Sequence, residues 1–233
     1  MGASLPRVII VTGTDTDVGK TVVTAAIAAV LHRAGLGVVA YKPTQTGVEP
    51  SEPGDMAEVT RLTGVTGHDG VRLHAPMAPR PAASLEAALL PSLAAHLSAI
   101  RALAERHDHV VVEGAGGLLV ELTDARDTLV DLATAVPGSA VVVVARSGLG
   151  TLNHTMLTRE ALVRRKIRSL GIVIGAWPDQ PSVIEQTNRA YFEELAEGLL
   201  GAVPLGAPAL DPATFADKAA AWLPGLAQRL GTP

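Results

Sequence analysis

The sequence predicts an α/β protein with a mostly parallel sheet that helices flank on both faces. Short runs rich in Val and Ile alternate along the chain with longer runs rich in Ala and Leu. Strands that are apolar throughout are typical of a parallel sheet, because both of its faces are buried. The 233 residues, 48% of them hydrophobic, suffice for one buried core, so we expect a single domain over residues 1–233.

Six β-branched runs have the length and composition of buried strands. They cover residues 7–11, 37–41, 109–112, 140–144, 171–174 and a weaker run at 202–205. Each run is separated from the next by enough chain for a helix, as a parallel connection requires.

The Ala- and Leu-rich segments between these runs supply the expected helices. We predict helices over residues 20–34, 56–62, 85–106, 153–168 and 183–198, and one that starts at Asp211 and Pro212. Gly35 follows the first helix at the position of a left-handed cap, and Pro91 is expected to break the helix over 85–106. The segment HAPMAPRPAA, residues 74–83, is interpreted as an ordered loop.

Composition and charge exclude several classes of function. A net charge of −4 offers no basic surface to a polyanion and 3% aromatic residues leave little for base stacking, so we expect no nucleic-acid partner. The absence of cysteine excludes disulfides, thiolate metal sites and cysteine nucleophiles, and it fits a cytoplasmic location. No apolar run approaches the roughly 20 residues of a membrane span, so we expect no membrane partner.

The segment VTGTDTDVGKT has the features of a phosphate-binding loop with irregular spacing. Gly13 and Gly19 enclose five residues where the pattern GxxxxGK(S/T) has four, so Thr14 stands at the usual first glycine. A predicted strand precedes the loop and a predicted helix follows it, as a phosphate site requires. Lys20 would then contact the terminal phosphates and the Thr21 hydroxyl would bind Mg²⁺. The alternative is an ordinary turn with a solvent-exposed lysine.

A second motif, YKPTQTG, follows the predicted strand at residues 37–41. It places Lys42 at the carboxyl end of that strand, the edge at which open α/β sheets bind ligands, with the hydroxyls of Thr44 and Thr46 beside it. The chain has four lysines against fifteen arginines, which favours a functional role for both Lys20 and Lys42. The alternative for Lys42 is a lysine that extends from the strand end into solvent.

The third motif, HVVVEGAGG, contains the candidate metal ligand Glu113. An unpaired carboxylate at a buried strand end is costly, whereas bound Mg²⁺ would hold it charged. Asp55 is a second candidate ligand or the N-cap of the helix over 56–62, and these roles are compatible. The alternative for Glu113 is a helix-capping or salt-bridged side chain. With an empty metal site, we expect Glu113→Gln to leave stability unchanged or raised, because two like charges repel.

Four motifs together resemble the dethiobiotin synthetases, the ATP-dependent carboxylases that close the ureido ring in biotin biosynthesis. The motifs are GTDTDVGKT, KPTQTG, EGAGG and GLGTLNHTMLT, in the family's order and over essentially the full chain. The family's phosphate loop characteristically has five residues between its glycines. It usually carries Glu where this chain has Asp17, and the shorter side chain is expected to shift that contact without removing it. The resemblance implies a P-loop NTPase-like fold.

The reaction that this resemblance implies needs no protein nucleophile. 7,8-Diaminononanoate takes up CO₂ as a carbamate on one amine, the carbamate oxygen attacks the γ-phosphate of ATP, and the second amine closes the ring while phosphate leaves. Lys20 and Lys42 are implied as the catalytic residues, which stabilise the carbamate and the transferring phosphoryl group. Thr21, Asp55 and Glu113 are implied as the ligands of Mg²⁺.

The resemblance also implies the binding residues. Those for the nucleotide are Asp17, Val18, Gly19, Lys20, Thr21, Val22, Asp55, Glu113, Gly114, Ala115, Gly116, Pro178, Asp179, Val203, Pro204 and Leu205. Those for the substrate are Thr14, Thr46, Leu152 and Asn153. A homodimer with its sites at the interface is implied as well, in which the helix start near Leu152 and Asn153 binds the carboxylate of the substrate in the other subunit.

The position that reads the base departs from the family pattern. Many members have Asn-Asp after the strand equivalent to 171–174, and the asparagine reads adenine, whereas this chain has Pro178 and Asp179. Proline offers no side-chain donor and no backbone N–H, so main-chain groups such as the carbonyl of Gly175 or the amides within 203–206 remain to read the base. We therefore expect weak base discrimination, with ATP and CTP both accepted.

Three alternatives share parts of this pattern. A partitioning-type ATPase has the irregular loop but carries a signature lysine near its start, where this chain has Thr14, Asp15 and Thr16. The amidotransferases of cobyrinate synthesis need an additional domain with a catalytic cysteine, and this chain has no cysteine. A nucleotide-binding regulatory module without chemistry is the third alternative.

Overall fold

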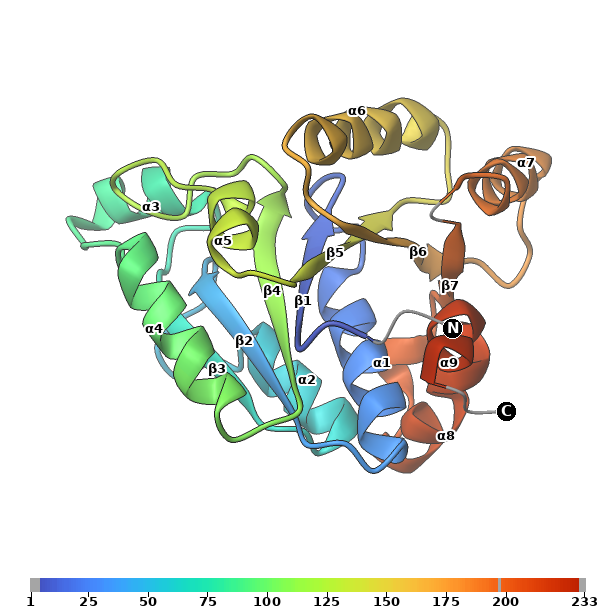
Figure 1. Cartoon of the computed structure of the whole chain (residues 1–233), viewed down its shortest axis with the longest axis horizontal. Helices are drawn as coiled ribbons and strands as arrows, with labels where there is room; N and C mark the ends of the chain where they lie inside the picture. The colour runs from blue at the N-terminus through green and yellow to red at the C-terminus, as the bar shows by residue number, and fades with distance from the viewer. Residues whose placement is uncertain (1–4, 197, 231–233) are drawn as a thin grey trace.

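The structure is a computed structural model that describes residues 5–196 and 198–230. Its centre is a sheet in which all paired strands are parallel (Figure 1). The strands of the described residues are β1 (Val8–Gly13), β2 (Val38–Gln45), β3 (Gly67–Arg72), β4 (His109–Gly117), β5 (Ala140–Ala145), β6 (Ser169–Trp177) and β7 (Leu199–Pro204). Their order across the sheet is β3-β2-β4-β1-β5-β6-β7, so β1 lies between β4 and β5.

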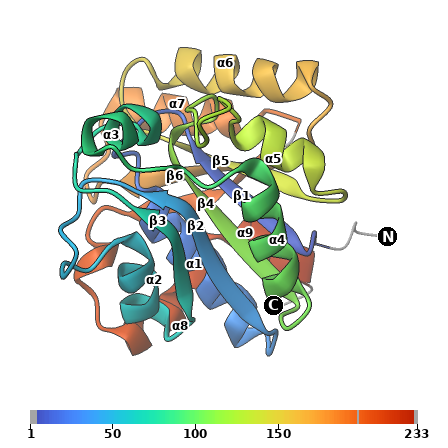
Figure 2. The same cartoon turned by 90° about the vertical axis from the view of Figure 1, so that its left-hand side faces the viewer.

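Helices cover both faces of this sheet (Figures 1 and 2). One face packs against α1 (Lys20–Arg33), α2 (Asp55–Thr63), α8 (Pro212–Trp222) and α9 (Pro224–Leu230). The other face packs against α4 (Leu93–Ala104), α5 (Leu129–Ala135), α6 (Thr151–Arg164) and α7 (Val183–Glu193). The remaining helical segments are α3 (Pro79–Glu86) and the 3₁₀ turn η1 (Ala207–Ala209). None of the helices in the described residues is long and apolar enough to cross a membrane.

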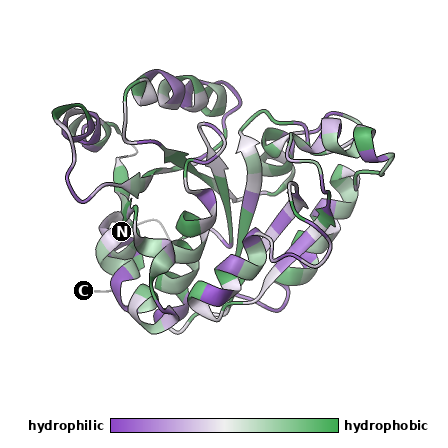
Figure 3. Cartoon of the chain, turned by 180° about the vertical axis from the view of Figure 1, so that it is seen from behind, coloured by the Kyte–Doolittle hydropathy of each residue, from purple (hydrophilic) through white to green (hydrophobic). Residues whose placement is uncertain are grey.

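Two large apolar clusters pack against the sheet, one on each face, and the described residues form a third, smaller cluster around α3. Along β1, Ile9 and Val11 belong to the cluster with α1, whereas Val8 and Ile10 belong to the cluster with α4 and α5. All four are buried, and Figure 3 shows the hydrophobic strands between the more polar outer helices. Successive side chains of a strand point to opposite faces, so a run of four apolar residues serves both clusters. The prediction of a doubly covered parallel sheet is confirmed.

The strand β3 was not predicted, because its sequence GHDGVR contains one apolar side chain besides its glycines. It lies at the edge of the sheet, pairs only with β2 among the described strands, and leaves its residues partly exposed. Edge strands need no continuous apolar run, so the signal used for the other strands is missing here.

The predictions for residues 74–106 were partly wrong. The break near Pro91 is confirmed, since α3 ends at Glu86 and α4 begins after its N-cap Ser92. However, α3 begins at Pro79, inside the segment predicted as a loop. Proline fits the first turn of a helix because its missing N–H has no partner there in any case, so a proline-rich segment can start a helix as well as form a loop.

Several other boundaries differ from the predictions. The helix α6 spans Thr151–Arg164 instead of 153–168, α7 ends at Glu193 instead of 198, and β7 begins at Leu199 instead of 202. Residue 197 of the predicted helix over 183–198 lies outside the described residues. The helices α5 and α9 and the turn η1 were not predicted. The start of α8 is confirmed, because the Asp211 side chain accepts from the Thr214 N–H.

Candidate functional site

The phosphate-loop segment connects β1 directly to α1, as predicted. Gly19 precedes the first helical residue with a left-handed backbone (φ 91°). A Cβ atom at this position would lie 2.5 Å from the carbonyl oxygen of Gly175 at the end of β6. Only glycine combines this conformation with so close an approach. The loop is therefore packed against the sheet, and the start of α1, whose first N–H groups have no partner within the helix, follows it directly.

Lys20 lies within this loop region and not on the surface. It is 8% exposed, and its Nζ donates to the carbonyl oxygen of Asp15 at 3.0 Å. Burial lowers the pKa of Lys20, and the charge of Glu113 opposes that shift. The alternative of a solvent-exposed lysine is wrong, and the ammonium group is held beside the loop.

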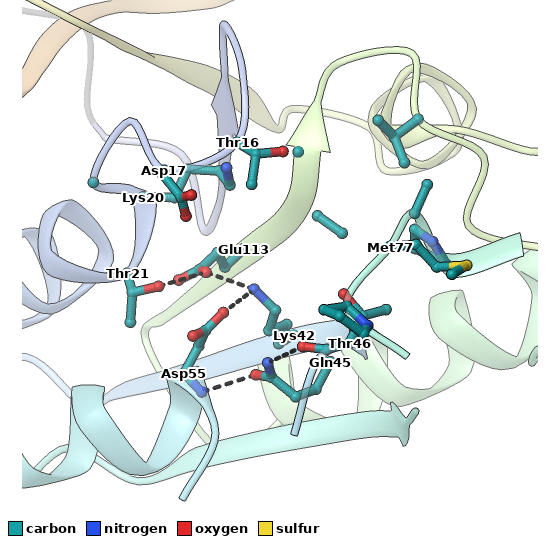
Figure 4. Close-up of a pocket in the computed structure, with 18 of the residues that line it drawn as sticks. Thr16, Asp17, Lys20, Thr21, Lys42, Gln45, Thr46, Asp55, Met77 and Glu113 are labelled. Carbon is teal, nitrogen blue, oxygen red and sulfur yellow. Dashed lines mark hydrogen bonds and ion pairs between the residues drawn. The ribbon is translucent and has the colours of Figure 1, made fainter. Parts of the chain in front are cut away.

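Lys42, Asp55 and Glu113 form a charge cluster, to which β2, α2 and β4 each contribute one residue (Figure 4); Lys42 and Glu113 are buried and Asp55 is partly exposed. The Lys42 Nζ lies 2.7 Å from Glu113 Oε1 and also forms an ion pair with Asp55. Burial alone lowers the pKa of Lys42, but the charges of Glu113 and Asp55 outweigh it, so the net shift is upward and the lysine is charged. Lys42 is 4% exposed, so the alternative of a lysine extended into solvent is wrong.

The same cluster corrects two predictions about the carboxylates. Asp55 is the first residue of α2, whereas Gly54 is the N-cap, so the predicted capping role of Asp55 is wrong and its side chain pairs with Lys42 instead. Glu113 forms a salt bridge with Lys42, and its role as a metal ligand stays a prediction. The two carboxylates do not face each other as bare like charges, because the ammonium group contacts both. The expectation for Glu113→Gln rested on that repulsion and loses its basis.

The oxygen atoms of this cluster fit Mg²⁺. Thr21 Oγ1 donates to Glu113 Oε1 at 3.0 Å, while Glu113 Oε2 is buried without a hydrogen-bond partner among the described residues. The described residues hold no group of three or more His, Cys, Asp or Glu side chains suited to a metal. Mg²⁺ does not need such a group, because one or two carboxylates bind it while water and substrate phosphates complete its coordination shell. Two carboxylates and one hydroxyl suit that requirement.

A cavity of about 690 Å³ brings these groups together at the carboxyl ends of the strands. The predicted site residues that line it are Asp17, Gly19, Lys20, Thr21, Val22, Lys42, Thr46, Asp55, Glu113, Ala115 and Gly116. The residues that the sequence reasoning missed are Thr16, Gln45, Gly47, Pro76, Met77, Ala78, Pro79 and Val120. Gln45 belongs to the motif YKPTQTG, and residues 76–79 belong to the proline-rich segment 74–83. The sequence therefore offered a signal for both.

The other predicted residues lie outside this cavity. They are Thr14, Val18, Gly114, Leu152, Asn153, Pro178, Asp179, Val203, Pro204 and Leu205. Val18 and Val203 are buried in the core, and Gly114 lets the backbone pass close to Leu129. Thr44 is likewise absent from the cavity wall, and its hydroxyl is buried without a partner among the described residues.

The predicted base-reading residues gather at the ends of β6 and β7. The N–H of Leu205 donates to the carbonyl of Trp177 at 2.8 Å, which places Pro178 next to the end of β7. The Leu205 N–H is one of the main-chain donors expected to read the base, and this hydrogen bond to Trp177 already occupies it. The carbonyl of Gly175 lies against Gly19, which connects this region to the phosphate loop.

The start of α6 is tied to the phosphate loop through Arg146, which the sequence reasoning missed. The Arg146 guanidinium lies 2.8 Å from the Asp15 carboxylate, and the Arg146 carbonyl accepts from the Thr151 hydroxyl at 2.8 Å. Leu152 is partly buried against the core, whereas Asn153 is exposed. The predicted carboxylate-binding residues therefore lie at a partly exposed helix start that is connected to the loop but separate from the cavity.

Comparison with known proteins identifies several relatives. Residues 7–213 match a family model described as an AAA domain. The chain is 49% identical over 217 residues to the ATP-dependent dethiobiotin synthetase BioD of Rhodococcus jostii, covering 92% of this chain and 94% of that protein. The protein of the same name from Streptomyces avermitilis is 49% identical, with 96% and 93% covered. That of Mycobacterium tuberculosis is 44% identical, with 94% and 98% covered.

Solved structures share the fold at low identity. The cell division ATPase MinD of Pyrococcus furiosus has a TM-score of 0.59 and 19% identity, with 99% of each chain covered. A GTPase from Pyrococcus abyssi has a TM-score of 0.53 and 17% identity, with 93% of this chain and 84% of that chain covered. An ATPase and a GTPase thus have this fold, and the predicted P-loop NTPase-like class is confirmed.

Proposed function

The chain belongs to the dethiobiotin synthetases, and we propose that the cavity around Lys20, Lys42 and Glu113 is where it makes dethiobiotin. The reaction is the ATP-dependent joining of CO₂ to 7,8-diaminononanoate with closure of the ureido ring. The observation that carries the proposal is the convergence in one cavity of two buried lysines with Thr21, Asp55 and Glu113.

The residues of the cavity perform the reaction by position and charge, and none of them acts as a nucleophile. The N–H groups at the start of α1 and the Lys20 ammonium hold the phosphates in line with the carbamate oxygen. Lys42 neutralises the carbamate and the phosphoryl group while the oxygen–phosphorus bond forms and the bond to ADP breaks. The second amine then attacks the carbonyl carbon of the mixed anhydride, phosphate leaves, and Thr46 orients the diamine.

Thr21, Asp55 and Glu113 are the proposed ligands of Mg²⁺. When bound, the ion neutralises charge on the β- and γ-phosphates. The buried and unpartnered Glu113 Oε2 supports this assignment. Lys42 contacts both carboxylates, and the proposal implies that these ion pairs rearrange when the ion and the nucleotide enter.

The variant Glu113→Gln is expected to raise the Mg²⁺ concentration for half-maximal activity by at least about tenfold, because one charged ligand is lost. It should also lower the melting temperature of the metal-free protein, since Lys42 loses one of its two carboxylate partners. Magnesium titration of turnover and thermal unfolding with EDTA measure the two effects. Unchanged magnesium dependence would remove Glu113 from the metal site.

Weak discrimination between nucleoside triphosphates is expected from Pro178. Asparagine pairs with adenine through two hydrogen bonds worth about 1–3 kcal/mol of discrimination, and proline makes neither bond. Main-chain carbonyls, such as that of Gly175, accept from the exocyclic amine of either adenine or cytosine. Competition experiments should show that ATP and CTP are both used and that UTP is used less well. A preference for ATP over CTP beyond about a hundredfold would show that another residue reads adenine.

We further propose a homodimer in which the start of α6 completes the site of the other subunit. Leu149, Leu157 and Val163 in and beside α6 each expose more than half of their surface, which supports a partner on this face. The N-terminal N–H groups of α6 suit the substrate carboxylate near Leu152 and Asn153. Light scattering should give twice the chain mass of 23.9 kDa, and a fully active monomer would contradict the proposal.

Phosphate release with and without 7,8-diaminononanoate, combined with mass detection of dethiobiotin, tests the main proposal. We expect release to depend on the diamine, on CO₂ and on Mg²⁺, and one phosphate to accompany each dethiobiotin. Phosphate release at the same rate with and without the diamine would favour a partitioning-type ATPase. The absence of phosphate release would favour a nucleotide-binding regulatory module.

A further inference from the structure

Gln45 lies in the cavity wall between two groups that the proposed reaction needs. It is the last residue of β2 and is 4% exposed. Its Oε1 accepts from the backbone N–H of Asp55 at 2.8 Å, and its Nε2 donates to the carbonyl of Thr46 at 3.0 Å (Figure 4). One end of the amide meets a donor and the other meets an acceptor, so both the position and the orientation of the side chain are determined.

The contact to Asp55 replaces a missing helix cap. The first N–H groups of a helix have no partner within it, and a side chain at the N-cap often provides one. The N-cap of α2 is Gly54, which has no side chain to do so. Gln45 supplies the acceptor from the neighbouring strand instead. The first turn of α2, which carries the Asp55 carboxylate, is thereby attached to the end of β2.

The surrounding backbone is shaped for this contact. A Cβ atom at Gly54 would lie 2.9 Å from Gln45 Oε1 and 3.0 Å from Arg72 Nη1, so a larger residue would push the amide away. Arg72 pairs with Gln45 across β2 and β3, and it donates to the carbonyl of Glu52 at 2.6 Å. The absence of a side chain at Gly54 therefore leaves room for the Gln45 amide at the start of α2.

We propose that Gln45 is a positioning residue that fixes Asp55 at the metal end of the cavity relative to Thr46 at the substrate end. This inference rests on the proposed function, in which Asp55 is a ligand of Mg²⁺ and Thr46 orients the diamine. Catalysis by position is sensitive to shifts of about 1 Å, and each of the two groups depends on one end of the same amide. A substitution that changes only one end of the Gln45 amide can therefore test the two contacts separately.

The test compares Gln45→Met, which removes both hydrogen bonds at similar volume, with Gln45→Glu, which keeps the acceptor but loses the donor. Two quantities are measured: the Kd of Mn²⁺ in the presence of a non-hydrolysable ATP analogue, by electron paramagnetic resonance, and the KM for diaminononanoate. We expect Gln45→Met to raise both by about tenfold, the lower end for lost outer contacts of a metal site. Gln45→Glu should raise the KM while leaving the Kd unchanged or lower.

Thr44→Val is the matched control, because Thr44 is the buried neighbour on β2 and its hydroxyl has no partner among the described residues. It should leave both quantities near those of the wild type. If Gln45→Met lowers only the melting temperature, or if Gln45→Glu weakens Mn²⁺ binding as much as Gln45→Met does, the positioning role is wrong. Should Gln45→Met not fold, Gln45→Glu alone decides: a raised KM with retained Mn²⁺ affinity supports the role. Dethiobiotin formation by the wild type in the same assay keeps a failure of this inference distinct from a failure of the proposed function.

Discussion

Lys20→Ala is expected to lower kcat/KM for ATP by about a hundred- to a thousandfold, or roughly 3–4 kcal/mol, which is typical for the loss of one preorganised donor to a developing charge. The ammonium group is buried beside the phosphate loop and has only the carbonyl of Asp15 as its hydrogen-bond acceptor among the described residues. Its removal therefore leaves the loop without the cation that we propose for the terminal phosphates. Initial rates of phosphate release measure the effect.

The control for this variant is Lys218→Ala. Lys218 is an exposed lysine on α8 and does not line the cavity, so its removal should leave turnover unchanged. The stability of Lys20→Ala should remain close to that of the wild type, because the lost hydrogen bond is a single contact to a carbonyl group. If Lys20→Ala keeps more than about a tenth of the wild-type rate, Lys20 is not in the site.

Lys42→Ala is expected to have two large effects, one on activity and one on stability. Turnover should fall by about a hundred- to a thousandfold, since Lys42 is the second cation of the cavity. The metal-free protein should also lose roughly 3–5 kcal/mol of unfolding free energy, the usual cost of breaking a buried ion pair from one side. The fully buried Glu113 would be left without its cation, and Asp55 would lose the same partner.

The response of the melting temperature to Mg²⁺ distinguishes a loss of ion pairs in Lys42→Ala from a simple packing defect. If Asp55 and Glu113 are metal ligands, Mg²⁺ with ADP should raise the melting temperature of Lys42→Ala by more than it raises that of the wild type. The ion would replace the missing cation. The double variant with Glu113→Gln should be more stable without metal than Lys42→Ala alone, since it removes the unpaired buried charge. A melting temperature of Lys42→Ala that does not respond to magnesium would contradict the metal assignment.

The sequence by itself determined the fold class and indicated the family and the charged residues of the candidate site. The apolar runs predicted six of the strands, because a strand buried on both faces must be apolar along its length. The irregular loop with Lys20 and the order of four motifs indicated the family. The strand and loop signals are local, since burial periodicity and glycine conformation are set within a few residues of one another, and the motif order can be read along the chain without the fold.

The tertiary structure alone decided which charges meet. Lys42 and Glu113 are 71 residues apart in sequence and come together because β2 lies beside β4 in the sheet. Asp55 is the first residue of α2 and not its N-cap, and its side chain pairs with Lys42 while Gln45 from β2 binds its N–H. Strand order is set by the packing of the whole sheet and leaves no local pattern. A sequence can therefore supply the charged groups of a site, while the partner that each group finds depends on which strands become neighbours.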